Sequence, residues 1–214
     1  MKKRILFCLI LTLFFVGPLD TFAQPAPGNE ASNSTAVPLV EGLHELLLQS
    51  MKAGESMTCS QRYERLEPYI LKAFDFPLIC RIVLGRHWKE LDKAKREEFI
   101  KVFSRMTVAT YASRFDAWSG ESFKTIYAGM DKKGHFRVET FLVKKNGEKI
   151  SLDYACRRSG DDWKIVSVSA RGVNDLSVKR AAYASYLKEH SIDELMAKLE
   201  KYAKKCLENS EKRK

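Results

Sequence analysis

The chain has 214 residues, 45% of them hydrophobic and 30% charged, and its formal net charge is +10. This length is enough for one domain with a single hydrophobic core. In a cytoplasmic protein such a basic balance would favour nucleic acid as a partner. The N-terminal residues described next indicate export, which excludes nucleic acid. The charge is then explained by anionic lipid headgroups, by acidic partner proteins or by solubility alone.

The first 23 residues have the pattern of a secretory signal peptide. Residues 2–4 are basic, residues 5–16 are apolar, and Thr21 and Ala23 occupy the two positions that a signal peptidase reads. The apolar run is shorter than the roughly 20 residues that a spanning helix needs, although an uncleaved anchor is the alternative. We expect cleavage before Gln24 and release into the periplasm. The remaining chain has a net charge of +8, because the signal peptide carries three basic residues and one acidic residue.

The segment that follows, residues 24–37, is rich in Pro, Ala, Ser and Asn and predicts a flexible linker. Helical spacing of apolar residues begins just after it. Gly54 is placed to end the first helix, Pro68 to bend the second, Pro77 to open the third and Asp92 to cap the fourth. The predicted helices cover residues 38–53, 59–74, 77–87 and 92–118.

After Gly120 the apolar spacing changes from helical to alternating, which predicts strands joined by turns. The predicted strands cover residues 122–130, 134–144, 148–158 and 162–171. Two helices follow, one over 175–189 and one that opens with Ser191 and Glu194 at the spacing of a capping box. This order predicts an α+β domain over 38–207, a four-stranded antiparallel meander roofed by helices, and a disordered tail over 208–214.

The turn at Lys145-Asn146-Gly147 determines the register of its hairpin. A two-residue Asn-Gly loop would put the apolar residues of the two strands on opposite faces. A three-residue loop, with Gly147 in the left-handed conformation, pairs Leu142 with Ile150 and aligns them, so we predict this loop. The last strand has apolar residues on both faces, which predicts a central strand covered on both sides.

Four cysteines remain after cleavage, Cys59, Cys80, Cys156 and Cys206, without the close spacing of a zinc site. In an oxidising compartment they allow two disulfides in any of three connectivities. Cys80 and Cys156 lie among apolar residues, which predicts buried thiols equally well.

Catalytic signatures are missing from the sequence. It contains no nucleophile elbow, no glycine-rich phosphate loop and no HExxH motif. The four histidines, at positions 44, 87, 135 and 190, lie on separate elements with no partner nearby in sequence. We therefore expect a protein without catalytic residues, bound metal or cofactor.

A series of short motifs runs through the chain at characteristic spacing. In order, they are Phe74-Asp75-Phe76-Pro77, Leu84-Gly85-Arg86-His87-Trp88, Phe99, Phe103, Tyr111, Gly147, Tyr154, Trp163-Lys164-Ile165 and Val168. With these motifs the chain resembles the MlaC family, the toluene-tolerance periplasmic phospholipid carriers, over roughly residues 38–203.

Further motifs make the chain similar to the hopanoid-associated HpnM branch of that family. They are Met51-Lys52-Ala53-Gly54, Gln61-Arg62-Tyr63, the run from Arg114 to Glu121, Leu152-Asp153-Tyr154, and Val178-Lys179-Arg180 followed by Tyr183. The chain departs from the usual family pattern at Ser167, where Asp is usual, and at Asn174-Asp175, where the phospholipid carriers usually have Ser-Leu.

The resemblance implies a cone of helices against a curved sheet, similar to nuclear transport factor two, enclosing an apolar cavity for lipid tails. It implies a non-catalytic shuttle that carries a phospholipid or a hopanoid between the inner and outer membranes. The implied partners are the membrane lipid, an inner-membrane transporter complex and an outer-membrane lipoprotein complex. Two other functions stay open, an enzyme of the ketosteroid-isomerase-like fold and an envelope adaptor or chaperone with a filled core.

Assignment of residues to faces predicts where a lipid would bind. The predicted lining residues are Phe103, Met106, Thr110, Val138, Leu142, Leu152, Tyr154, Val166 and Val168. On the last strand, the face with Trp163 and Ile165 is the alternative to the face with Val166. Arg86, Lys164 and Arg180 are candidates for contacts with the headgroup or a partner, with ordinary surface charge as the alternative for each.

Overall fold

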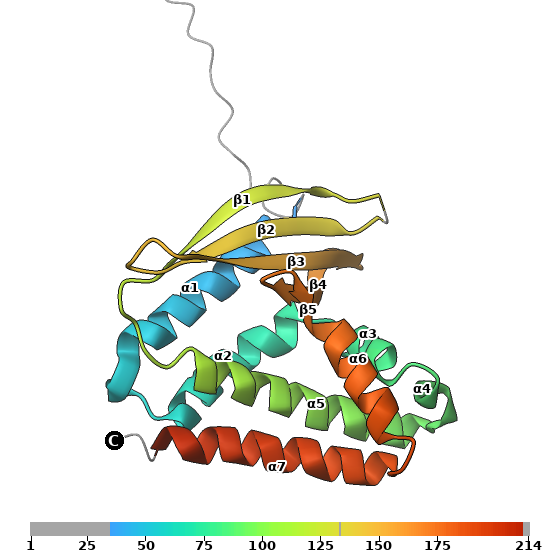
Figure 1. Ribbon diagram of the computed structural model, residues 1–214. Helices are drawn as coiled ribbons and strands as arrows, with labels where there is room; N and C mark the ends of the chain where they lie inside the picture. The colour runs from blue at the N-terminus through green and yellow to red at the C-terminus, as the bar shows by residue number, and fades with distance from the viewer. Residues whose placement is uncertain (1–34, 133, 212–214) are drawn as a thin grey trace, which may run out of the picture.

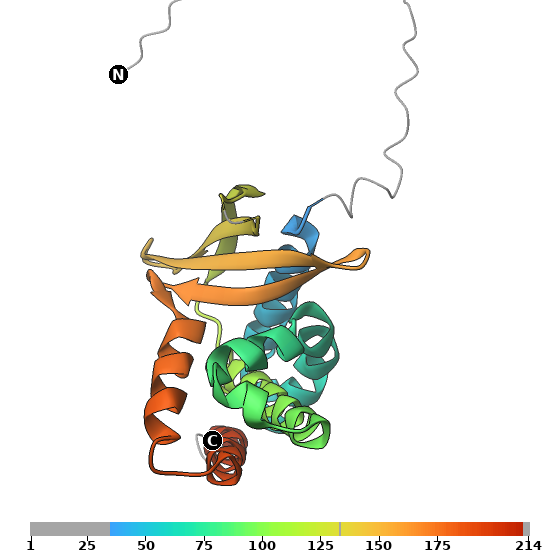
Figure 2. The ribbon, with the colours of Figure 1, turned by 90° about the vertical axis from the view of Figure 1, so that its right-hand side faces the viewer.

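The computed structural model describes residues 35–132 and 134–211. The predicted signal peptide and most of the predicted linker therefore lie outside the described residues. In the described part, a curved antiparallel sheet lies across a layer of helices (Figures 1 and 2). This arrangement confirms the predicted α+β fold class.

The elements follow the predicted order of helices, strands and helices. The helices before the sheet are α1 (Val37–Ala53), the 3-10 turn η2 (Gly54–Ser56), α2 (Cys59–Ala73), α3 (Phe76–Leu84), α4 (His87–Glu90) and α5 (Lys93–Arg114). The strands are β1 (Ser122–Met130), β2 (Phe136–Val143), β3 (Lys149–Ser159), β4 (Asp162–Ala170) and β5 (Val173–Asn174), and the closing helices are α6 (Asp175–Tyr186) and α7 (Ile192–Glu211).

Local capping explains where several helices begin. The Asp92 carboxylate accepts a hydrogen bond from the Lys95 amide at 2.7 Å, as predicted for the start of α5. Ser191 and Glu194 form the predicted capping box before α7, each side chain accepting from the other's backbone amide. The cap of α2 was not predicted: the Thr58 side chain accepts a hydrogen bond from the amide of Gln61 and caps the helix in the same way.

Four helix ends differ from the prediction, and two of these are small: α3 ends at Leu84 and not at 87, and α6 ends at Tyr186 and not at 189. The longest helix before the sheet ends at Arg114, four residues short of the predicted end, and extended chain leads from there to β1. The last helix continues to Glu211, into the segment predicted to be a disordered tail. The buried residues Leu195, Leu199 and Ala203 anchor this helix, and Cys206 and Leu207 still pack against the core just before the extension begins.

The strands follow one another across the sheet in the order β1-β2-β3-β4-β5, which confirms the predicted meander. The sheet has five strands and not four, because Asn174 and Val173 pair with Ser169 and Ala170. Periodicity could not reveal a strand of two residues. This short strand leads directly into α6 and so sets where that helix leaves the sheet.

The β2–β3 hairpin has the predicted three-residue loop. Leu142 pairs with Ile150, and Gly147 has a φ of 82°, in the left-handed region. The Lys144 amide donates to the Glu148 carbonyl at 2.9 Å and closes the loop. The inward residues of the two strands therefore share one face, with Val138 opposite Tyr154.

A β-bulge in β4 corrects the prediction for that strand. Cys156 pairs with Ile165 and Ala155 pairs with Ser167, so Val166 is an additional residue. After the bulge the alternation restarts, and Val168 lies opposite Tyr154 on the same face as Ile165. The apolar residues on both sides of this strand therefore reflect a bulge and not two covered faces. Val166 is buried but does not belong to the main hydrophobic cluster.

One hydrophobic cluster joins the inner sheet face, which is the face that carries Tyr154, to the helices. Cys80 and Cys156 are fully buried thiols within it, one of the two alternatives that the sequence left open. Figure 2 shows α6 running down one side from the sheet and α7 crossing below. In the described ranges, every helix is too short or too polar to span a bilayer.

Candidate functional site

The inner sheet face is shielded unevenly along its strands. At one end, Val138, Cys156 and Ile165 are completely buried; we call this the packed end. At the end nearer the β2–β3 hairpin, four apolar side chains on the same face are only half-buried. This second group, the open end, consists of Leu142, Ile150, Leu152 and Val168.

A buried polar pair lies between these two ends. His44 of α1 and the Tyr154 hydroxyl are hydrogen-bonded at 2.9 Å, and the His44 ring stacks on Phe123 with centroids 4.0 Å apart. Burial lowers the pKa of His44 to about 4, so the imidazole is neutral at pH 7. The pair satisfies two polar groups inside an apolar core and leaves neither available to a substrate.

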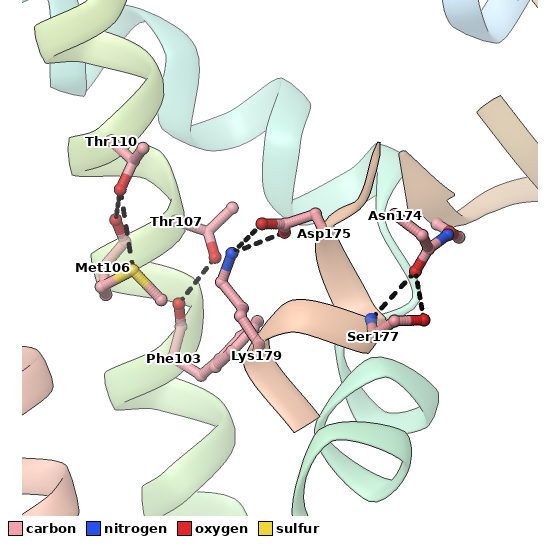
Figure 3. Close-up of polar contacts among 9 residues, drawn as sticks. Phe103, Met106, Thr107, Thr110, Asn174, Asp175, Ser177 and Lys179 are labelled. Carbon is pink, nitrogen blue, oxygen red and sulfur yellow. Dashed lines mark hydrogen bonds and ion pairs between the residues drawn. The ribbon is translucent and has the colours of Figure 1, made fainter. Parts of the chain in front are cut away.

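Helices α5 and α6 face each other, with Phe103 of α5 packed against Tyr183 of α6, and Figure 3 shows the side chains between them. On α5 the hydroxyls of Thr107 and Thr110 donate to carbonyls of their own helix, Phe103 at 2.9 Å and Met106 at 2.8 Å. These internal hydrogen bonds leave the threonine methyl groups to cover the helix surface.

The facing side of α6 carries an ion pair. Its side chains are Asp175 and Lys179, one turn apart, and both lie on the side of α6 that is turned toward α5 (Figure 3). Asn174 fixes the start of the helix, because its side-chain oxygen accepts a hydrogen bond from the Ser177 amide at 3.0 Å. The ion pair is thus held close to the sheet.

Two tyrosine hydroxyls add donors near this pair. Neither Tyr111 of α5 nor Tyr183 of α6 has a hydrogen-bond partner among the described residues, although both rings pack in the core. In the described ranges no fully buried polar side-chain atom lacks a partner, so neither hydroxyl is an unsatisfied buried donor. Burial raises the pKa of each, and the nearby Asp175 carboxylate raises it further, so both remain protonated donors.

The predicted lining residues divide into two groups. Phe103, Met106, Val138, Tyr154 and Val166 are buried, and all of these except Val166 belong to the continuous core. Thr110, Leu142, Leu152 and Val168 are half-buried and lie on α5 and at the open end. On β4, the bulge brings Ile165 from the alternative face and Val168 from the chosen face to the same side of the sheet.

The three predicted basic contacts do not form one site. The Arg180 side chain of α6 lies against Gly85, the residue before Arg86. Lys164 instead reaches α2, where its ammonium group donates to the Lys72 carbonyl at 2.6 Å. It lines a separate surface hollow of about 200 Å³ beside Tyr69.

Another surface hollow, of about 320 Å³, lies at α3 and was not predicted. Its rim includes Arg81 and Trp88, and inside it the Arg157 guanidinium donates to the Asp75 carboxylate at 2.7 Å. Because this ion pair already satisfies the only carboxylate in the hollow, the hollow offers no group positioned for acid–base chemistry.

Sequence reasoning missed the polar groups of the site. Asp175, Lys179 and Tyr183 are spaced four residues apart and so share one helix face, a pattern that the sequence contains but that does not show what the face meets. The contact with α5 depends on how β5 positions α6. Among residues 35–132 and 134–211, no three His, Cys, Asp or Glu side chains are grouped so as to bind a metal ion.

Comparisons with known proteins identify both a family and a similar fold. The family described as MlaC protein matches residues 42–201. The intermembrane phospholipid transport system binding protein MlaC of Haemophilus influenzae is 23% identical over 125 residues, which are 56% of this chain and 58% of that protein. The phospholipid-binding protein of Ralstonia solanacearum, solved in complex with a phospholipid, is 17% identical with a TM-score of 0.69, over 81% of this chain and 99% of that one.

Proposed function

The chain belongs to the MlaC protein family, and from that premise we propose that it binds a phospholipid and carries it through the periplasm between the inner and outer membranes. The open end carries this proposal. Leu152 and Val168 face inward on neighbouring strands, yet they remain only partly buried where they pack against the hydrophobic cluster. Apolar side chains in that position are suited to contact acyl chains.

The energetics of lipid transfer explain why such a carrier is needed. Each exposed CH₂ group costs about 0.8 kcal/mol, so one chain of about 16 carbons would cost on the order of 13 kcal/mol in water. A protein that covers the chain removes most of this barrier. The matched proteins support the proposal, since one is named as a phospholipid transport protein and the other was solved with a phospholipid.

Export and release complete the proposal. The N-terminal signal would deliver the chain to the periplasm, and docking to an inner-membrane transporter complex and an outer-membrane lipoprotein complex would load and unload it. A hopanoid is the alternative ligand, because the sequence is similar to the hopanoid-associated branch of the family.

The carrier function is proposed in place of an enzymatic one. A ketosteroid-isomerase-like enzyme needs a carboxylate base inside its cavity, poised to accept a proton. Asp175 approaches two tyrosine hydroxyls, but its side chain is 56% exposed and its carboxylate is paired with the Lys179 ammonium group. A carboxylate held in this way is suited to binding charge.

The test begins with protein purified gently from the periplasm, extracted with organic solvent and analysed by mass spectrometry. We expect a stoichiometric phospholipid; a hopanoid in its place would identify the alternative ligand. Repeated empty extracts, together with no uptake from labelled vesicles, would contradict the carrier and favour the adaptor with a filled core.

A charge at the open end should separate binding from folding. Leu152→Asp would place a carboxylate against the acyl chain and should reduce lipid uptake more than tenfold, because burying an unpaired charge is strongly unfavourable. Ile126→Asp is the matched control, since Ile126 lies at a bulge of the edge strand β1 and is 47% exposed. Equal uptake by the two variants, both folded by circular dichroism, would place the lipid elsewhere.

A further inference from the structure

The side of α6 that is turned toward α5 carries charges of both signs. The side chains of Asp175 and Lys179 point toward α5, and Lys179 is largely shielded, with 24% of its side chain exposed. Tyr183, one turn further along the same face, packs edge-on against Phe103 of α5. Asp175 and Lys179 precede this aromatic contact along α6, so the charges lie at the end of the helix that follows β5, close to the sheet.

The hydroxyls of Tyr111 and Tyr183 are the second feature of this region. Burial and, after it, the charge of the Asp175 carboxylate raise the pKa of Tyr111 and of Tyr183, and the Tyr183 ring packs against Phe103 on the same side of α6. A protonated hydroxyl beside an apolar surface can donate to an ester carbonyl or a phosphate oxygen. These are the acceptors that a glycerophospholipid presents where its tails meet its headgroup.

The charge pattern discriminates among headgroups. A phosphate drawn to the Lys179 ammonium group must also lie near the Asp175 carboxylate, which repels it unless the headgroup carries a positive charge of its own. A zwitterionic headgroup supplies both signs, with the phosphate for Lys179 and the ammonium group for Asp175. An anionic headgroup supplies only the sign that Asp175 opposes.

On the premise of the proposed function, we propose that Asp175 and Lys179, with the hydroxyls of Tyr111 and Tyr183, form a headgroup site that selects zwitterionic phospholipids over anionic ones. The pair opens, and each member exchanges its partner for the opposite charge of the headgroup. The tyrosine hydroxyls hold the ester region at the boundary between tails and headgroup.

The experiment is a competition between headgroups. Delipidated protein is mixed with vesicles that contain equal parts of dioleoyl phosphatidylcholine, phosphatidylethanolamine and phosphatidylglycerol, then separated from the vesicles, and its bound lipid is measured by mass spectrometry. We expect each zwitterionic lipid to exceed phosphatidylglycerol about fivefold, the size of effect of one partly exposed charge pair. Two zwitterionic lipids are used because only their charge is common to both.

Asp175→Asn gives the sharpest variant, since it keeps the side-chain shape and leaves Lys179 unpaired. The preference should reverse toward phosphatidylglycerol, whereas Lys179→Gln should weaken uptake of phosphatidylglycerol most. Glu148→Gln is the matched control, because it neutralises a carboxylate paired with Lys144 and Arg171 at the hairpin. Tyr111→Phe and Tyr183→Phe should weaken uptake of all three lipids without changing their ratio.

The outcomes separate this proposal from the one it rests on. Uptake of lipid in vesicle proportions by wild type, with the same proportions in Asp175→Asn, would overturn the headgroup site and leave the carrier intact. Uptake of no lipid by any folded form would overturn the proposed function and the headgroup site together. A reversal in Asp175→Asn but not in Glu148→Gln would support both.

Discussion

The packed and open ends of the inner sheet face differ in shielding although the same strands build both. At the packed end the segment between α2 and α3 lies directly on the sheet: Phe74 forms a parallel bridge with Ile165, and the Asp75 amide donates to the Ile165 carbonyl at 2.9 Å. At the open end Leu152 and Val168 face the same way and are half-buried. The helices, and not the strands, therefore decide which apolar residues stay accessible.

The largest expected effect tests this difference directly by truncating one residue at each end. Ile165→Ala should lower the free energy of unfolding by about 4 kcal/mol, because it removes fully buried methylene groups and leaves a cavity in a tightly packed region. Leu152→Ala should cost less, about 1 kcal/mol, because part of this side chain remains exposed to solvent in the folded protein.

Urea denaturation of both variants, followed by tryptophan fluorescence and circular dichroism, measures the contrast. The ranking should reverse when lipid uptake is measured in place of stability, with Leu152→Ala weakening uptake more than Ile165→Ala among the folded molecules. Equal stability losses at the two positions would show that the open end is as tightly packed as the other.

A second test concerns the polar pair between the two ends. The pKa of His44 is lowered by burial to about 4, from 6.5 when the chain is unfolded. Below pH 6.5 the unfolded chain therefore binds a proton that the folded protein does not, and stability falls as the pH decreases toward 4. The loss across this window should approach about 3 kcal/mol, and above pH 6.5 this histidine should contribute no pH dependence.

Denaturation curves at pH 7, 5.5 and 4.5 measure this slope. His44→Gln should flatten it, since the amide can still bond to the Tyr154 hydroxyl but does not titrate. His135→Gln is the control, because His135 is partly exposed beside Asp131. A His44→Gln variant as acid-sensitive as wild type would assign the slope to other groups.

Sequence patterns a few residues long correctly predicted the features that depend only on neighbouring residues in the chain. The Asp92 cap, the Ser191 capping box and the Leu142–Ile150 register all follow from side chains within a few residues, and the structure confirms them. The Val166 bulge and the strand Val173–Asn174 depend on pairing with a neighbouring strand, which periodicity does not report.

The polar part of the candidate site was missed for the same reason. Nothing local to Asp175 or Lys179 indicates that their helix meets α5, because that contact follows from the two-residue strand that leads into α6. Likewise, Tyr111 fits the apolar periodicity of the long helix, and only the folded arrangement shows that its pKa is affected by Asp175 of α6. The predicted apolar residues were easier to assign, because alternation along a strand already indicates a face.

The smallest expected effect concerns the turn that orients the open end. Gly147→Ala should cost about 1 kcal/mol, because φ at this position is 82° and an L side chain is strained there. No atom lies within 4 Å of the position that the new Cβ would take, so backbone strain is the whole of the effect. Gly147→Asn should cost less, since Asn adopts the left-handed conformation more readily.

Lipid uptake distinguishes strain from a change of register in these variants. If the loop keeps its three residues, Leu142 and Ile150 remain on the inner face and uptake stays at the wild-type level despite the loss of stability. A slip of one residue would turn Ile150 and Leu152 to the outer face, since side chains alternate along a strand. Loss of uptake in Gly147→Ala, restored in Gly147→Asn, would therefore show that this glycine maintains the register of the open end as well as relieving strain in the turn.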